Sequence, residues 1–188
     1  MDALNNTNID RGSLWHRWDP HIHTPNTALN NQYRGADPWE AFLSKVEASD
    51  PSIEVLGITD YFSIDNYEKV LAFKRAGRLG KIGLIFPNVE LHLSIETNRG
   101  APLNLHLLFP PDDPDHVDRI KRFLLEFEFQ YQKDNFRCSR EDLIRLGMQH
   151  APDTTDPEAA RSIGANQFKV SLERLMEARN KHDWVKAN

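Results

Sequence analysis

The chain of 188 residues contains a single cysteine, Cys138. One thiol cannot form an internal disulfide, which is typical of a protein kept in a reducing compartment. No apolar run approaches the roughly 20 residues of a membrane-spanning helix. The first segment, MDALNNTNIDRGS, is polar and lacks the apolar core of a secretion signal. We therefore expect a cytoplasmic protein with no membrane partner.

An excess of basic residues is also missing, because the formal net charge is −5. This charge excludes a global basic field of the kind that attracts nucleic acid, although a local basic rim around a site stays compatible with it. No segment has the G-x-x-x-x-G-K-[ST] pattern of an ATPase phosphate-binding loop. The chain also lacks internal repeats, and its length suits one globular domain spanning residues 1–188.

Strand-like and helix-like patterns alternate along the chain. Strands are predicted at residues 14–23, 53–60, 81–96 and 102–109, the last two joined by a hairpin turn. Helices are predicted from Asp37, which looks like an N-cap, at residues 64–71, over the apolar positions from Val117 to Tyr131, and near 139–149 and 169–187. Residues 151–160 read as a flexible connection. This order favours an α/β fold with a largely parallel sheet, in which chemistry collects at the carboxyl ends of strands.

The motif WDPHIHT at residues 18–24 is the first candidate for such chemistry. Residues i and i+2 of a strand point to the same side, so His21 and His23 present two imidazoles to one point. Two imidazoles form a chelating pair for a transition metal. Asp19 or the Thr24 hydroxyl could hold the second ring nitrogen of a ligating histidine.

Three further polar residues of later strand-like segments complete the candidate set, the first two at or near strand ends and the third inside its strand. These are Asp60, Glu90 and His106. Each has a simpler explanation: the histidine pair as a polar strand face, Asp60 as the cap of the next helix, Glu90 as an ion-pair partner and His106 as a hydrogen-bonded core histidine. Their joint occurrence along successive strands favours a metal site over four separate structural roles.

The motifs WDPHIHT, LGITDY, PNVELHL and NLHLLF, in this order, resemble the polymerase and histidinol phosphatase (PHP) domain. The segments GITDYFSIDNYEKV and GANQFKVSLERL are closer still to the N-terminal PHP domains of large TrlF-type proteins. Those proteins carry an SMC-like or AAA-like ATPase further along the chain and are associated with bacterial defence and nucleic-acid processing. The resemblance covers roughly residues 14 to 110.

This resemblance implies a distorted seven-stranded β/α barrel and a metal-dependent phosphoesterase or nuclease. By that likeness His21 and His23 bind a first metal, Glu90 bridges to a second, and His106 binds the second. Asp19 and Asp60 would be catalytic, by orienting a ligand and by handling a proton or a water. The implied cofactors are divalent ions (Zn, Mn or Fe), and the implied substrate is a phosphate ester, which can include nucleic acid.

The chain departs from the PHP pattern at several positions. Tyr61 stands where the family has a histidine, Leu29 stands at another ligand position, and Asn88 replaces a glycine. We therefore expect two metals, not three. The family's late Ala-His-Pro and Asp-x-His motifs have no counterpart, so we expect the chain to be the front part of a longer protein, with added helices in its C-terminal part. Later residues, another chain or an ATPase domain would complete the site. The alternative is a non-catalytic module that binds a metal or a phosphate as a sensor or docking domain.

Overall fold

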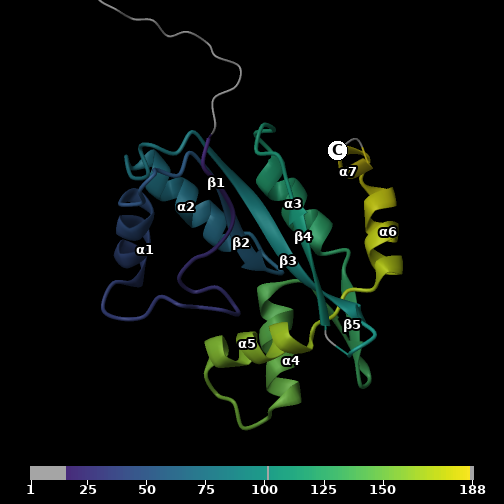
Figure 1. Cartoon of the computed structure of the whole chain (residues 1–188). Coiled ribbons are helices and arrows are strands. Elements are labelled where there is room, and N and C mark those ends of the chain that lie inside the picture. The colour runs from purple at the N-terminus through teal and green to yellow at the C-terminus, as the bar shows by residue number, and fades with distance from the viewer. Residues whose placement is uncertain (1–15, 101, 187–188) are drawn as a thin grey trace, which may run out of the picture.

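A four-stranded sheet forms the centre of the protein in a computed structural model that describes residues 16–100 and 102–186. The strands are β1 (Trp18–His23), β2 (Val55–Tyr61), β3 (Leu84–Glu96) and β4 (Pro102–Leu108), in the order β1-β2-β3-β4. β1, β2 and β3 are parallel, and β4 returns antiparallel to β3. The sheet is curled like an open half-barrel (Figure 1). The expected α/β class and the hairpin between the last two strands are confirmed.

Seven helices and a small hairpin surround this sheet in the described part of the chain. The helices are α1 (Pro38–Glu47), α2 (Asp65–Arg75), α3 (His116–Leu124), α4 (Arg140–His150), α5 (Pro157–Gln167), α6 (Leu172–Lys181) and α7 (Asp183–Lys186). β5 (Glu128–Tyr131) and β6 (Asp134–Arg137) pair as a separate two-stranded sheet. The described residues thus form a mixed α/β fold with a four-stranded curled sheet, and not a closed seven-stranded barrel. No helix among them is long and apolar enough to cross a membrane.

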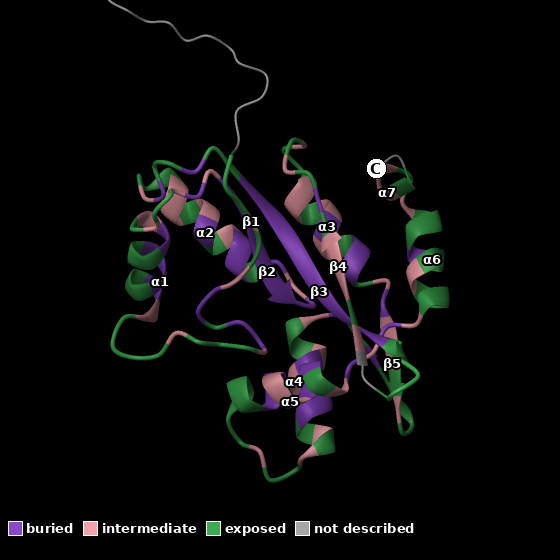
Figure 2. Ribbon diagram, viewed as in Figure 1, coloured by how far each residue is buried: buried purple, intermediate pink, exposed green. Residues whose placement is uncertain are grey.

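Helix α1 shows how closely local sequence signals fix the elements. The Asp37 side chain accepts a hydrogen bond of 3.0 Å from the Glu40 amide, and Pro38 takes the first helical position. The predicted apolar stripe of this helix, from Trp39 to Val46, is buried. Figure 2 shows β2 and the middle of β3 as the most continuously buried part of the fold, with the exposed sides of the helices facing outward.

Two predictions about the second half of the chain are wrong. The helix predicted to run to Tyr131 ends at Leu124, and Tyr131 belongs to strand β5. Residues 151–160, predicted as a flexible connection, include the start of α5, which Asp156 caps by accepting from the amides of Glu158 and Ala159. Helices α4 and α5 pack closely together, beyond the carboxyl ends of β2 and β3 (Figure 1). The predicted first strand begins at Trp18, and residues 14–15 lie outside the described part.

Candidate metal centre

The metal-ligand candidates share one face of the curled sheet. Alternation along each strand puts every second residue on this face. The polar residues there are His21 and His23 of β1, Thr59 and Tyr61 of β2, Asn88, Glu90 and His92 of β3, and Asn104 and His106 of β4. The β3–β4 register places Glu90 directly opposite His106. The opposite face carries apolar residues such as Leu56, Ile58 and Val89, which belong to the core under the helices.

A local irregularity of β1 brings its two histidines toward this face. The β1–β2 register shifts between Asp19 and Ile22. The Pro20 carbonyl oxygen in this irregularity would lie 2.2 Å from a Cβ atom at Gly57, so only glycine allows the approach. The Asn88 side chain reaches across β2 from β3 and donates a hydrogen bond of 2.9 Å to the same carbonyl. Gly57 and Asn88 therefore fix the position from which His21 and His23 project.

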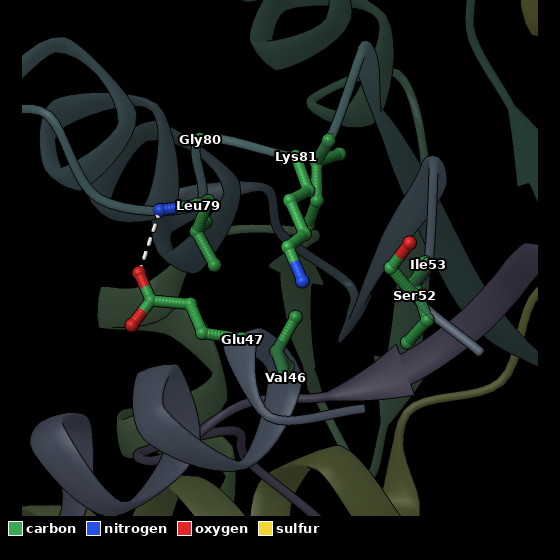
Figure 3. Close-up of a pocket in the computed structure, with 8 residues that line it drawn as sticks. Val46, Glu47, Ser52, Ile53, Leu79, Gly80 and Lys81 are labelled. Carbon is green, nitrogen blue, oxygen red and sulfur yellow. Dashed lines mark hydrogen bonds between the residues drawn. The ribbon is translucent and has the colours of Figure 1, made fainter. Parts of the chain in front are cut away.

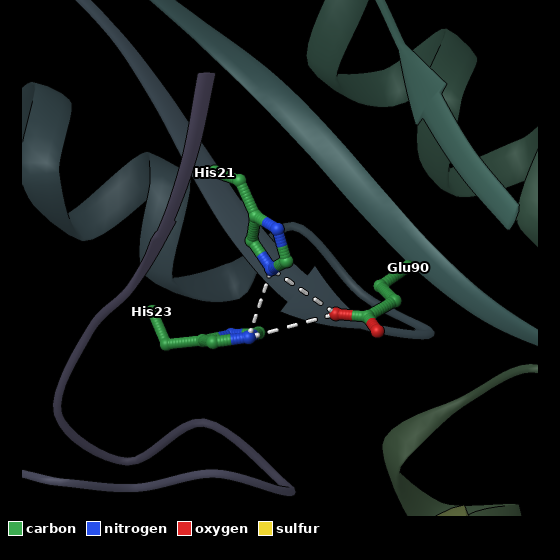
Figure 4. A group of neighbouring side chains, drawn as sticks. All are labelled: His21, His23 and Glu90. Atoms are coloured by element: carbon green, nitrogen blue, oxygen red, sulfur yellow. Dashed lines mark hydrogen bonds and ion pairs between the residues drawn. The ribbon is translucent and has the colours of Figure 1, made fainter. Parts of the chain in front are cut away.

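His21, His23 and Glu90 converge, and each points one atom at the same small space (Figure 4). The Nε2 atoms of the two histidines are 3.1 Å apart, and each lies 3.5 Å from Oε2 of Glu90. The point equidistant from these three atoms is about 2.0 Å from each, which matches zinc–nitrogen and zinc–oxygen distances. The group can therefore hold a metal ion without rearrangement.

The environment of the Glu90 carboxylate also suits a cation. Its Oε2 atom is fully buried and has no hydrogen-bond partner among the described residues. A buried carboxylate oxygen without a partner is costly, commonly by about 1–3 kcal/mol or more. Two imidazole nitrogens only 3.1 Å apart likewise need a shared proton or a cation between them. A divalent metal would satisfy all three atoms at once.

The protein fixes the tautomer that a metal requires at His23. Nδ1 of His23 lies 3.2 Å from the Thr59 carbonyl oxygen, which can only accept, so Nδ1 carries the proton and Nε2 presents a lone pair. Burial lowers the pKa of His23, against the opposing effect of Glu90, so the ring is readily neutral. The expected holders of a ring nitrogen were Asp19 or Thr24. In the structure the main-chain carbonyl of Thr59 holds this nitrogen of His23. The Thr24 hydroxyl donates to the Pro25 carbonyl instead.

His106 lies at the edge of the cluster with the same tautomer. Its Nδ1 is 3.0 Å from Oδ1 of Asn88, whose amide nitrogen is engaged by the Pro20 carbonyl. Nε2 of His106 therefore presents a lone pair, 4.0 Å from Oε1 of Glu90. Its ring centroid is 4.5 Å from that of His21. Burial lowers the pKa of His106 as well. His106 thus faces Oε1 of Glu90, whereas His21 and His23 face Oε2.

Two asparagines that the sequence analysis did not assign to the site hold its ligands. Asn88 orients His106, as described, and Asn104 donates a hydrogen bond of 2.6 Å to Oε1 of Glu90. Asn104 lies two residues before His106 on β4, and Asn88 lies two residues before Glu90 on β3. The same i, i+2 rule that paired His21 with His23 would have placed both asparagines on the site face.

Tyr61 closes the cluster on its other side. Its ring is stacked on His23 and lies edge-on to His92, with centroid distances of 5.3 and 5.4 Å. The Tyr61 hydroxyl accepts a hydrogen bond of 2.7 Å from the Asn30 amide. Burial, followed by the negative charge of Glu90, raises the pKa of Tyr61 well above its ordinary value. Tyr61 is therefore a neutral wall of the site at physiological pH and not an anionic ligand.

The two predicted catalytic aspartates lie in different places. Asp19 lines a hollow of about 330 Å³ together with His21 and His23, and one of its oxygens lies 3.4 Å from the His21 main-chain nitrogen. Asp60 is buried on the opposite face of β2 from Tyr61. Its two oxygens accept from the main-chain and side-chain nitrogens of Asn66, at 2.9 and 2.7 Å, at the start of α2. The structure therefore gives Asp60 the simpler role of holding a helix start, because strand alternation turns it away from the cluster.

A hollow of about 250 Å³ away from the cluster lies between the end of α1 and the loop after α2, where Val46, Ile53 and Leu79 form an aliphatic wall (Figure 3). The Leu79 amide donates a hydrogen bond of 2.7 Å to Glu47 there. None of the histidines or Glu90 reaches this hollow. The chemistry is concentrated at the carboxyl ends of β1 and β2 and in the middle of β3.

No family model, curated protein or solved structure matches the chain in comparisons with known proteins. What the protein does has to follow from the chemistry of its site.

Proposed function

We propose that the protein is a metal-dependent phosphoesterase or nuclease that hydrolyses a phosphate ester. The observation that carries this proposal is the convergence of His21, His23 and Glu90, with the unpartnered Oε2 of Glu90 facing two imidazole nitrogens at 3.5 Å. Mixed imidazole and carboxylate ligands suit Zn, Mn or Fe. When bound, such an ion lowers the pKa of water and neutralises phosphoryl charge.

The position of His106 supports a second ion beside the first. Glu90 presents Oε2 to His21 and His23 and Oε1 to the lone pair of His106. The 4.0 Å between Oε1 and the His106 nitrogen is about twice a zinc–ligand distance, so one cation fits between them. Glu90 would then bridge two ions, with Asn104 and Thr59 holding Glu90 and His23 in place.

The fold and partners proposed with this function follow the resemblance to PHP domains. The four-stranded half-barrel would be the front part of a distorted seven-stranded barrel. The remaining ligands would come from further residues, from a second chain, or from an associated ATPase domain. In this arrangement Asp19, which lines the hollow next to His21 and His23, would orient substrate or water.

A second candidate function is a non-catalytic module that binds a metal or a phosphate as a sensor or docking domain. One observation favours it: among the described residues, only three histidine and acidic side chains meet closely enough to share one ion. Three ligands from the protein suffice for a catalytic zinc, with a fourth position left open. They suffice for a sensor equally well.

Hydrolysis by matched forms of the protein separates the two candidates. Two forms are assayed with Mn or Zn: the 188-residue chain alone, and a longer form with any further residues of the natural protein and any subunits that co-purify with it. The assays measure phosphate release and cleavage of labelled nucleic acid. We expect weak or no hydrolysis by the short chain and clear hydrolysis by the longer form. His21→Ala with His23→Ala should abolish that activity, with a thermal melt confirming an intact fold. A longer form that binds metal but hydrolyses nothing would support the sensor.

A further inference from the structure

A polar hollow of about 580 Å³ adjoins the metal-ligand cluster on the side of Tyr61. We name it the Tyr61 hollow. The loop after β1 forms one wall and helix α5 forms the other, with Tyr61 and His92 between them. The polar residues of its two walls are Asn30, Asn31 and Arg34 from the loop and Ser162 and Asn166 from α5. The hollow is therefore rich in hydrogen-bonding groups and poor in apolar surface.

The lining of the Tyr61 hollow carries one cation and no acidic residue. That cation is Arg34, which is exposed. Within the described part of the chain, no hydrogen bond or ion pair engages the Arg34 guanidinium, so it is available to a ligand. A guanidinium binds phosphate oxygens through two parallel N–H donors.

A second cation, Lys169, lies directly behind two lining residues. Its Nζ donates to the Asn166 carbonyl oxygen at 2.9 Å and to Nδ1 of His92 at 3.3 Å. Burial lowers the pKa of Lys169, and the opposing effect of Glu96 is smaller. This partly desolvated cation gains stability from an anion placed in the hollow.

The Tyr61 hollow and the metal-ligand cluster share a wall. Tyr61 both lines the hollow and stacks on His23. His92 follows Glu90 by two residues on the same face of β3. A molecule with one anionic group at the cluster therefore has its neighbouring groups within reach of the hollow.

We propose that the Tyr61 hollow binds a second, non-reacting phosphate group of the substrate through Arg34, with the charge of Lys169 behind the lining adding to the attraction. This inference rests on the proposed function for the identity of the substrate, which would carry at least two phosphates. Asn30, Asn31, Ser162 and Asn166 would bind the polar group that joins them. A phosphomonoester with a single phosphate would leave the hollow unused.

The first test measures phosphate binding without metal, so that the outcome does not depend on hydrolysis. Inorganic phosphate is titrated into ¹⁵N-labelled protein in EDTA, with acetate at equal ionic strength as the comparison anion. We expect saturable shifts of the amides of Asn30, Asn31, Ser162 and Asn166. Arg34→Gln should weaken binding by about tenfold, the loss of one charge-assisted hydrogen bond, and Lys169→Gln should weaken it through the loss of the nearby positive charge. Lys81→Gln, an equal change of charge at the hollow of Figure 3, should leave it unchanged.

The outcomes separate this inference from the proposed function. Saturable shifts at the hollow in the His21→Ala, His23→Ala protein would support the phosphate site even where metal binding is lost. Shifts that are diffuse, or equal with acetate, or insensitive to Arg34→Gln and Lys169→Gln, would overturn it. In the metal-loaded protein, thymidine 3′,5′-bisphosphate should bind about tenfold more tightly than thymidine 5′-monophosphate. Equal affinity for the two nucleotides would overturn the claim that the substrate carries two phosphates, whatever the enzyme hydrolyses.

Discussion

Tyr61 lies parallel to His23, with ring planes 7° apart and centroids separated by 5.3 Å. The tyrosine thus covers one face of a metal-ligand candidate, at a position where the PHP pattern proposed for the chain has another histidine. Its hydroxyl is engaged by Asn30, and burial raises its pKa. A neutral phenol here holds the His23 imidazole in place and contributes no charge to the metal.

The number of metal ions follows from this pairing. Without a ligand from Tyr61 or Leu29, we expect at most two divalent ions per chain, one at His21 and His23 and one at His106, with Glu90 between them. Elemental analysis of the purified protein after removal of loosely bound metal measures this number directly. Three tightly bound equivalents per chain would contradict the assignment of Tyr61 as a neutral wall.

Metal-dependent stabilisation should depend on Glu90. At a free metal concentration of about 100 times Kd, binding adds about 2.7 kcal/mol to the free energy of unfolding, which corresponds to a rise in Tm of roughly 5–11 °C for a chain of this size. Glu90→Gln removes the anionic oxygen between the two imidazoles and should abolish most of this rise. Thermal melts with and without Zn or Mn measure it.

The matched control is His150→Ala, which removes a histidine whose Nδ1 pairs with the Tyr131 hydroxyl away from the site. It should leave the metal-induced rise in Tm unchanged. If Glu90→Gln keeps the full rise, the metal binds somewhere other than the cluster of Figure 4.

The site was largely predictable because alternation along strands is a geometric rule. It identified His21 and His23 as a pair, and the ends of later strands pointed to Glu90. The residues that hold these ligands were harder to find. Thr59 acts through its main-chain carbonyl, which is independent of residue type, and Asn104 is an ordinary residue in sequence until its partner Glu90 is known. Asp60 was harder to place because a strand end alone does not say which face a side chain occupies.

The fold was less predictable after β4. The apolar stripe that begins at Val117 continues at helical spacing as far as Tyr131, although the helix ends at Leu124. Phe127, in the connection between α3 and β5, is fully buried, so its side chain leaves water whether or not the helix continues. The start of α5 carried a clear signal, Asp156 followed by Pro157, which the polar residues before it obscured. Its close packing on α4 depends on distant glycines and cannot be read locally.

Those glycines give a test of the α4–α5 contact, which supports one wall of the Tyr61 hollow. A Cβ atom at Gly164 would lie 1.8 Å from the Leu143 carbonyl oxygen of α4, so the helices must separate to admit it. We expect Gly164→Ala to lower the free energy of unfolding by at least about 1–3 kcal/mol. Urea denaturation measures this change.

Gly80→Ala is the matched control, because no atom lies within 4 Å of a Cβ at that position. It should be neutral or slightly stabilising, by up to about 1 kcal/mol. An equally small effect of Gly164→Ala would mean that α4 and α5 are further apart than the structure has them.

The buried carboxyl of Asp60 should make stability depend on pH. Burial raises its pKa from 3.8 to about 7, while the two hydrogen bonds from Asn66 act in the opposite direction. Between these values the folded protein binds a proton at Asp60 that the unfolded chain has lost. The free energy of unfolding should therefore fall as pH rises from about 4 to 7, by at most about 1.4 kcal/mol per pH unit from this group.

Urea denaturation at several pH values between about 4.5 and 7.5 gives the free energy of unfolding as a function of pH. The slope of this free energy against pH for the Asp60→Asn variant is subtracted from the slope for the original chain. Because the asparagine side chain of this variant cannot titrate, the difference isolates the aspartate even though other groups change charge in the same range. A difference near zero would show that the two hydrogen bonds from Asn66 outweigh burial and keep Asp60 ionised. Asp60 would then hold the start of α2 as an anion near the helix N-terminus, where negative charge is stabilising.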